Sequence, residues 1–569
     1  MAILLRDTAF GRTLRLLTSE PTGLNHHRAA VDADIHPSKD ELVPEEAVYL
    51  VNWTGPTDED NPRNWPSWVK VLVLCNVLIV NLSFYTAPGI YSASINSIQE
   101  SLGASYEVAM LGLSLFVIAY GVGPLIFSMS SYRPFRISRP SVAPRVYMFG
   151  SLAFCLLSIG AALAKNIQTI IILRVLSGLV GASPTCIGGT TIAEVFGPRE
   201  VPYALATYVL SGVCGPSFGP LLGTAMVEVS VPFSTFYFFS PGSLIRPISD
   251  RWGSWSAALW LIAGIAAMST VFMFFLLPET LAANILYRRA AHLRQVTGDK
   301  RYRSPSEMEP MKNNLFGAMF EQIAVDVRLS FIDPVILFIN IHTMFIYGIL
   351  YLWYEFFPYV FQGIYGFTGI EQSCRFFFPS LPRLPILWLT ELTNSLMAFF
   401  GIFVGAVISV SSYMIWIHFY FQPHVARKEA NNEVVEPEEQ ILPGAVGAIC
   451  IPICLFTFGW TSRKDIPWIL PIIGTAFFAP RFHLTFQTVL NYLGQSYPIH
   501  LAGVFAGNAF FRSAFGGALP MAARRMLQSL GIGWACSVLG FISLAMIPPL
   551  FILYRYGKEW RSSSKYASK

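Results

Sequence analysis

The chain has 569 residues, of which 53% are hydrophobic and 13% charged, and its mean hydropathy is +0.50. Soluble domains carry roughly 25% charged residues, so this composition excludes a water-soluble globule. The net charge of +5 lies largely in loops and gives no indication of a nucleic-acid partner. The eight cysteines are scattered along the chain, which argues against a disulfide framework.

Residues 1–66 are polar and contain no apolar run suited to a signal peptide, so they are predicted to form a cytosolic N-terminal tail. The tail ends in the string Asp60-Asn-Pro-Arg-Asn-Trp65, a turn followed by a tryptophan of the kind found at membrane interfaces. The first membrane helix is therefore expected shortly after Trp65.

Apolar runs long enough to cross a bilayer as helices follow in two groups of six. The first group lies near 69–92, 108–129, 146–164, 167–192, 203–227 and 256–277. The second lies near 333–354, 395–420, 441–460, 466–490, 499–520 and 531–554. The sequence thus predicts an all-α membrane protein of about twelve transmembrane helices, with six-helix halves over 67–278 and 331–556, a central loop over 279–330 and a C-terminal tail over 557–569.

The central loop is basic and contains Arg288, Arg289, Arg294, Lys300, Arg301, Arg303, Lys312 and Arg328. Loops rich in Lys and Arg stay on the cytoplasmic side, so this loop and both termini are predicted to be cytoplasmic. The rule is less clean in the second half, where Arg463, Lys464, Arg524 and Arg525 fall on the outer side.

The span near 203–227 has a stripe of small residues, because its glycines recur at spacings of three or four: Gly212, Gly215, Gly219 and Gly223. Such a stripe lets a neighbouring helix approach backbone to backbone. Pro216 and Pro220 each remove a helix hydrogen bond and bend the segment. This stripe is interpreted as the seam on which the protein rocks; a plain packing seam is the alternative.

Arg174 lies in the fourth span, in the string Arg174-Val-Leu-Ser-Gly178-Leu-Val-Gly181-Ala-Ser183. An arginine inside a membrane helix costs several kcal/mol unless it is paired or hydrated, which makes it a functional candidate. The alternative is that its side chain extends to the nearby interface, since it is close to the helix start.

Glu355 ends the seventh span and shares a helix face with Tyr347 and Tyr351, since the three residues are four apart. Poorly hydrated aromatic surroundings disfavour the charged form of a carboxylic acid, so such a group can exchange a proton near neutral pH. The alternative is a solvated carboxylate at the outer interface.

Other polar residues in the spans are candidates for lining a substrate pocket. Pairs four apart share a face, either to line a cavity or to bond a neighbouring helix. These candidates, with Tyr347 and Tyr351, are Asn81, Tyr85, Gln487, Asn491, Asn508 and Arg512.

Several of these strings together resemble the twelve-helix drug:proton antiporters of fungi, a branch of the major facilitator superfamily that includes secondary-metabolite efflux pumps. The string around Arg174 is similar to the family's helix-4 motif, and Gly212–Gly223 to its helix-5 antiporter motif. Asp60–Trp65 resembles its "NPxNW" signature, and Pro278-Glu279-Thr280 its "PET" signature. The resemblance covers about residues 58–560.

The resemblance implies the major facilitator fold and export of a small hydrophobic compound in exchange for protons. It implies a coupling role for Arg174 and makes Glu355 the leading carboxylate. It also implies a multi-pass plasma-membrane protein that is monomeric, is not an enzyme, and has lipid, substrate and protons as its partners. No metal site or cofactor is expected, and the absence of a P-loop string disfavours an ATP-driven pump.

The chain departs from the family pattern in three segments, 128–145, 228–254 and 373–394. The first lacks the glycines and the acid of the family's loop between helices 2 and 3. Either the segments are genuine divergence or they are retained non-coding sequence. Three alternatives therefore stay open: a proton-coupled importer of the same fold, a sensor without transport, and a membrane enzyme such as an acyltransferase.

Overall fold

The computed structural model describes residues 8–18, 48–131, 142–197, 199–228, 254–308, 315–366, 387–433, 436–497 and 500–563. These residues are almost entirely helical, and the two short strands among them lie outside the membrane helices. Most of the three segments that depart from the family pattern lies outside the described residues.

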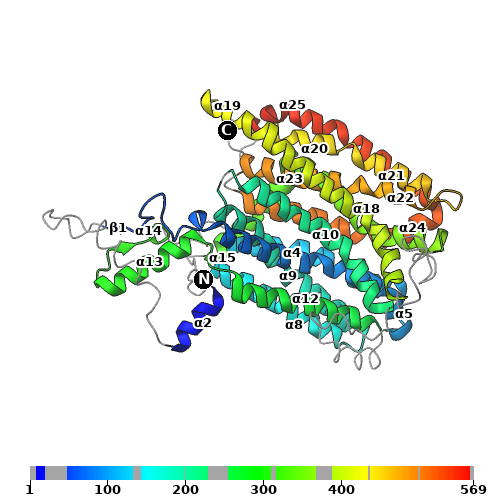
Figure 1. The fold of residues 1–569 in the computed structure, drawn as a ribbon, viewed down its shortest axis with the longest axis horizontal. Coiled ribbons are helices and arrows are strands. Elements are labelled where there is room, and N and C mark those ends of the chain that lie inside the picture. Colours follow the sequence, from blue (N-terminus) through cyan, green and yellow to red (C-terminus); the bar gives the residue numbers. More distant parts are fainter. Residues whose placement is uncertain are drawn as a thin grey trace.

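The helices run roughly along one direction and form two groups (Figure 1). In the first half the long helices are α4 (Ser67–Ala93), α6 (Tyr106–Ser131), α8 (Val142–Ala162), α9 (Ile167–Val195), α10 (Val201–Glu228) and α12 (Ser254–Leu276). The short helix α5 (Ile95–Leu102) joins α4 to α6.

Several helices of the second half are interrupted. Helix α16 (Pro334–Phe357) continues into the π-helical turn η3 (Pro358–Ile364), and α18 (Leu387–Trp416) continues through η4 (Ile417–Phe421) into α19 (Gln422–Ala430). The next two spans are η5 (Pro437–Ile441) with α20 (Leu442–Gly447) and α21 (Cys450–Thr461), and α22 (Ile469–Ala476) with α23 (Phe478–Ser496). The chain then forms α24 (Leu501–Ala545) and α25 (Ile547–Ser563).

The number of membrane helices agrees with the prediction. Among the described residues, ten helices are long and apolar enough to cross a membrane, and α8 adds a shorter apolar stretch, Met148–Ala162. The last of the ten covers 60 residues and bends at Gly531, whose φ of 70° is left-handed, so it contains two spans. The all-α, twelve-helix fold class is therefore confirmed.

Local sequence explains where several helices begin and end. Asn166 caps α9 by accepting a hydrogen bond from the backbone N–H of Thr169 (2.9 Å). Asp333 caps α16 in the same way, and Pro334 follows it at the first helical position, where a missing N–H has no cost. Gly103 ends α5 in the left-handed conformation that glycine adopts without strain.

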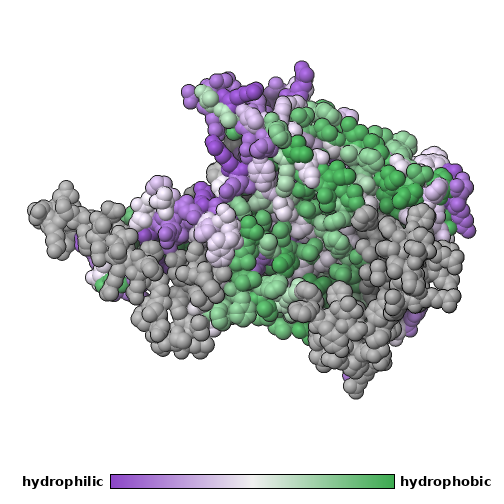
Figure 2. Space-filling model, viewed as in Figure 1, coloured by the Kyte–Doolittle hydropathy of each residue, from purple (hydrophilic) through white to green (hydrophobic). Residues whose placement is uncertain are grey.

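The flank of the bundle suits a lipid environment. Figure 2 shows hydrophobic side chains along the sides of the helices and hydrophilic ones gathered at the ends. Large apolar residues such as Phe149, Ile172 and Phe541 are 60%, 59% and 58% exposed. Exposure of so much apolar surface is expected where acyl chains replace water.

One end of the bundle carries the cytosolic elements, and we call it the tail face. It holds the amphipathic helix α2 (Ala9–Thr18), the strand β1 (Tyr49–Leu50), the 3-10 turn η2 (Pro62–Asn64), and the central-loop elements α13 (Ala282–Thr297), β2 (Tyr302–Arg303), α14 (Pro305–Met308) and α15 (Leu315–Ile332) (Figure 1). β1 pairs in parallel with β2, so the N-terminal tail and the central loop form one unit.

A buried ion pair ties the same two segments together. Arg289 of α13 donates to Asp58 of the tail (2.8 Å), and both side chains are almost fully buried. Burial raises the pKa of Asp58, but the Arg289 hydrogen bond and the N–H groups of Thr54 and Asp60 outweigh it and bring the pKa to about 2. The contribution of this carboxylate to folding is therefore complete above pH ~4 and is lost as the pH falls toward 2.

The "PET" signature also has a structural role at the tail face. Glu279 is buried and accepts a hydrogen bond from Arg12 of α2 (3.0 Å) and one from Asn284 (2.5 Å). Phe10 of α2 packs against Phe275 at the end of α12, with ring centroids 4.9 Å apart. The signature thus anchors the N-terminal helix beside the sixth span.

The two halves pack by related pairings of helices. Within the first half α4 packs against α10, and within the second half α16 packs against α24. Between the halves, α6 packs against α24 and α10 against α18. Four helix pairs therefore surround the centre of the bundle, where the candidate site lies.

Candidate functional site

A cluster of tyrosines occupies the middle of the bundle. Tyr85 of α4 and Tyr120 of α6 come from the first half, and Tyr347 and Tyr351 of α16 come from the second. The hydroxyl groups of Tyr120 and Tyr347 are hydrogen-bonded, and the Tyr351 hydroxyl lies 3.4 Å from that of Tyr120. All four side chains are at most 9% exposed. We call these four residues the tyrosine cluster.

Arg512 of α24 adds a positive charge to the tyrosine cluster. Its guanidinium lies 5.2 Å from the ring centroid of Tyr347 and 5.1 Å from that of Phe486, within cation–π range. One of its Nη atoms donates a long hydrogen bond, 3.4 Å, to the Tyr85 hydroxyl of the opposite half. Three predicted pocket tyrosines and Arg512 therefore lie together.

The other predicted pocket residues bond neighbouring helices within their own half. Asn81 donates to Ser211 of α10 (2.6 Å). Asn508 is buried and donates to Asn340 (3.0 Å) and Thr343 (2.7 Å) of α16. These two asparagines match the alternative in which a polar residue bonds an adjacent helix.

Gln487 and Asn491 occupy consecutive turns of α23. Gln487 donates to Asn491 (3.4 Å), and Asn491 donates to the hydroxyl group of Tyr413 on α18 (3.1 Å). Gln487 is fully buried, whereas Asn491 keeps part of its surface accessible. The geometry thus brings these residues to Tyr413 rather than to the tyrosine cluster.

Glu355 makes a contact between the two halves, near the end of the bundle opposite the tail face. Its carboxylate accepts a short hydrogen bond from the hydroxyl group of Tyr106, the first residue of α6. The guanidinium of Arg524 lies 4.7 Å from the centroid of the Tyr106 ring, and its charge acts on Glu355. Arg524, an exception to the positive-inside rule, therefore lies close to a carboxylate.

Arg174 is inside the first half and does not extend to the interface, since its side chain is 3% exposed. Its Nε donates to the carbonyl oxygen of Gly112 (2.7 Å). The guanidinium lies between two rings, 4.1 Å from the centroid of Tyr91 and 4.6 Å from that of Phe116. The ion pairs made by described residues do not include Arg174, so aromatic faces and one carbonyl stabilise this charge.

The glycine stripe of α10 packs against α4 of the same half. A Cβ atom at Gly219 would lie 2.7 Å from the Cα atom of Gly89 and from the carbonyl oxygen of Thr86. A Cβ atom at Gly215 would lie 2.6 Å from that of Tyr85, and one at Gly223 would be 2.5 Å from the carbonyl oxygen of Ile90. At Gly212 the nearest atom would be 4.0 Å away.

Close contacts between the halves come from different glycines. A Cβ atom at Gly517 of α24 would lie 2.6 Å from the carbonyl oxygen of Ser114 on α6. One at Gly121 of α6 would lie 2.9 Å from the Ser513 hydroxyl. The sequence singles out neither position, although Gly516-Gly517 in an apolar run is a signal for close helix approach.

The tandem prolines of α10 create an acceptor that the second half uses. In an α-helix the carbonyl of residue i accepts from the N–H of residue i+4, and Pro220 has no N–H, so the carbonyl of Pro216 lacks its helical partner. Tyr354 of α16 donates its hydroxyl to that oxygen (3.1 Å). This bond, one residue before Glu355, connects α10 to the opposite half.

We expect Tyr354→Phe to destabilise this closed arrangement by about 1–3 kcal/mol, because it leaves a buried carbonyl oxygen unsatisfied. Pro220→Ala restores the N–H, so in that background Tyr354→Phe is expected to have little effect. The melting temperatures of the four proteins in this double-mutant cycle measure the coupling. Equal effects of Tyr354→Phe in both backgrounds would contradict the role assigned to the Pro216 carbonyl.

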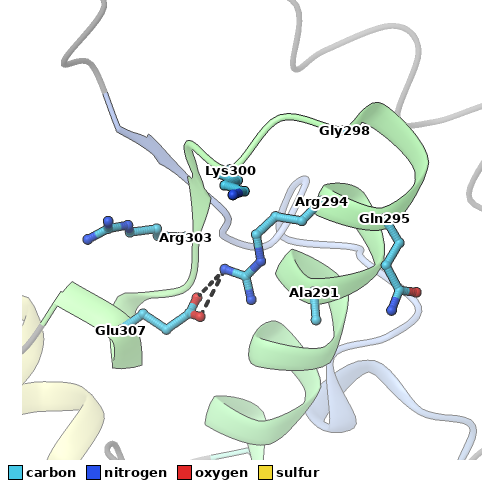
Figure 3. A pocket seen from close by; sticks show the side chains of 7 residues that line it. All are labelled: Ala291, Arg294, Gln295, Gly298, Lys300, Arg303 and Glu307. Atoms are coloured by element: carbon cyan, nitrogen blue, oxygen red, sulfur yellow. Dashed lines mark hydrogen bonds and ion pairs between the residues drawn. The ribbon is translucent and has the colours of Figure 1, made fainter.

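A separate pocket of about 650 Å³ lies in the central loop at the tail face. It is lined by Ala291, Arg294, Gln295, Gly298, Lys300, Arg303 and Glu307. Figure 3 shows Arg294 of α13 pointing toward Glu307 of α14, and their charged atoms are 2.9 Å apart. Because this pocket is outside the helix bundle and its acid is already paired, it is not a candidate for a site between the halves.

Solved structures share the arrangement of helices. A partially occluded, inward-open structure of the xylose transporter XylE from E. coli superimposes with a TM-score of 0.52, covering 86% of this chain and 98% of that chain. The sequence identity is 13%, so this likeness concerns the fold alone.

Sequence comparisons identify the family. The Major Facilitator Superfamily description matches residues 77–521. "Transporter mfs1" of Schizosaccharomyces pombe is 33% identical over 99% of both chains. The "Cycloheximide resistance protein" of Candida maltosa is 32% identical and the "Fluconazole resistance protein 1" of Saccharomyces cerevisiae 31% identical, each over more than 90% of this chain and at least 85% of theirs. The chain belongs to the major facilitator superfamily and, within it, to the fungal drug:proton antiporter branch.

Proposed function

We propose that this protein exports a small, largely apolar organic compound in exchange for protons. The observation that carries the proposal is the bond between Glu355 and Tyr106, which places an ionisable group where the two halves meet. Similarity to proteins named for cycloheximide resistance, fluconazole resistance and efflux supports an export role.

The coupling would follow from the position of Glu355. When the halves are together at this end of the bundle, Tyr106 covers the carboxylate and limits its hydration. When they separate, water reaches it and a proton can exchange. Alternating access by rocking of two halves around a fixed site is the general mechanism of such carriers.

Arg174 is proposed to support this coupling from the first half. It is a buried cation whose hydrogen bond ends on the Gly112 carbonyl of α6, the helix that also presents Tyr106. A change in the tilt of α6 would therefore act on both charged groups.

The proposal includes the wider setting. The protein is a multi-pass membrane protein, proposed to be a monomer of the plasma membrane with the tail face in the cytoplasm. Members of this family are transporters, and we propose that this chain acts as one and not as an enzyme or a sensor.

Inside-out vesicles with an acidic interior test the proposal. We expect such vesicles to take up hydrophobic compounds, with cycloheximide and fluconazole as the first probes, and a protonophore to abolish the uptake. Vesicles without the protein are the control. Accumulation that instead requires an acidic exterior would indicate an importer, and no uptake by folded protein would favour a sensor.

A further inference from the structure

The centre of the bundle contains a cation without an acidic partner among the described side chains. Ion pairs made by described residues do not include Arg512, and its Nε atom is buried without a hydrogen-bond partner. The groups that act on its charge most strongly are tyrosines, among them Tyr85, Tyr347 and Tyr120. Its bond to Tyr85, at 3.4 Å, is long for an N–H···O contact.

Flat aromatic walls stand beside this cation. Phe486 and Phe482 of α23 stack with ring centroids 4.4 Å apart, and Phe482 lies 6.1 Å from Tyr347. The tyrosine cluster supplies hydroxyl groups next to these rings. The surroundings suit a planar aromatic ligand with polar oxygen atoms.

Acidic residues of the spanning helices lie toward the ends. Among the described side chains, Glu194 is one residue from the end of α9, Glu107 is the second residue of α6, and Glu355 is three residues before the end of α16. A second buried arginine, Arg481, contacts His342 and the Gly444 carbonyl (2.9 Å) rather than an acid. The middle of the bundle is therefore electropositive.

We infer that the central site takes planar aromatic carboxylates in preference to organic ammonium ions, with Arg512 as the residue that holds the carboxylate. A guanidinium binds a carboxylate through two parallel hydrogen bonds, and the free Nε atom and the weakly held Nη atom provide both donors. An ammonium group in the same place would be repelled without a nearby carboxylate to compensate it. This inference rests on the proposed function, since it names the class of compound carried.

Binding to the purified full chain in lipid nanodiscs tests the inference. The probes are 2-naphthoate, its methyl ester and 2-naphthylmethylammonium at pH 7, which share one ring system and differ in charge. We expect 2-naphthoate to bind about tenfold or more tightly than the ammonium ion, with the ester between them. Arg512→Gln should remove the difference, and Arg512→Lys should keep its direction with weaker binding.

Arg525→Gln is the matched control, because Arg525 is an exposed arginine of the same helix and should not change the ranking. Equal or tighter binding of the ammonium ion, an unchanged ranking in Arg512→Gln, or no binding of any probe by folded protein would overturn the inference. If Arg512→Gln fails to fold, the ranking in the unaltered protein and in Arg512→Lys decides.

The same probes in inside-out vesicles separate this inference from the proposed function. Gradient-driven uptake of the ester without a preference for the carboxylate overturns the substrate class alone. A clear carboxylate preference in binding without gradient-driven uptake overturns proton antiport and leaves the selectivity of the site supported.

Discussion

Glu355→Gln is expected to reduce uptake driven by a pH gradient to the level of vesicles that lack the protein. The amide keeps the size of the side chain and can still accept the hydrogen bond from Tyr106, but it cannot take up or release a proton. The measurement is uptake into inside-out vesicles with an acidic interior, alongside binding of the same compound. We expect binding to persist while gradient-driven uptake is lost.

Glu107→Gln is the matched control for that experiment. Glu107 lies on α6 next to Tyr106, and its side chain is exposed, so removing its charge should leave uptake unchanged. Tyr106→Phe removes the donor but keeps the carboxylate, and should weaken coupling less than Glu355→Gln does. Full gradient-driven uptake by Glu355→Gln would remove this residue as the coupling group and leave the family assignment intact.

Gly219→Ala is expected to cause the largest loss of folded, active protein among single-methyl additions to the α10 stripe. The added methyl group would meet backbone atoms of Gly89 and Thr86 at 2.7 Å, and backbone cannot move aside as a flexible side chain can. Forcing extra atoms into a packed contact costs about 1–3 kcal/mol. The yield of monodisperse protein, its melting temperature and its transport rate measure the effect.

Gly212→Ala adds the same methyl group to the same helix where the nearest atom would be 4.0 Å away, and it should behave like the unaltered protein. The two variants share helix propensity effects, so the difference between them isolates the contact with α4. A Gly219→Ala protein as stable and active as Gly212→Ala would show that close approach of α10 and α4 is not required.

Local sequence alone determined the class of protein. Apolar runs of about twenty residues define the spans, because a helix of that length crosses the hydrocarbon core whatever its neighbours are. Spacings of three and four placed the α10 glycines on one face, and the structure uses that face for close packing. Asn166, Asp333 and Gly103 end or begin helices through contacts within a few residues, so they too are readable in the sequence.

Only the tertiary structure decided which faces meet. Periodicity shows that Asn81 and Tyr85 share a face of α4, but not that Asn81 bonds Ser211 within its half while Tyr85 contacts Arg512, 427 residues away. The glycine stripe could equally have faced the other half; it packs on α4, and Tyr354 takes the carbonyl that Pro220 leaves free. The physical reason is range: helix geometry is set by residues a turn apart, whereas helix pairing is set by shape and polar complementarity between segments far apart in the chain.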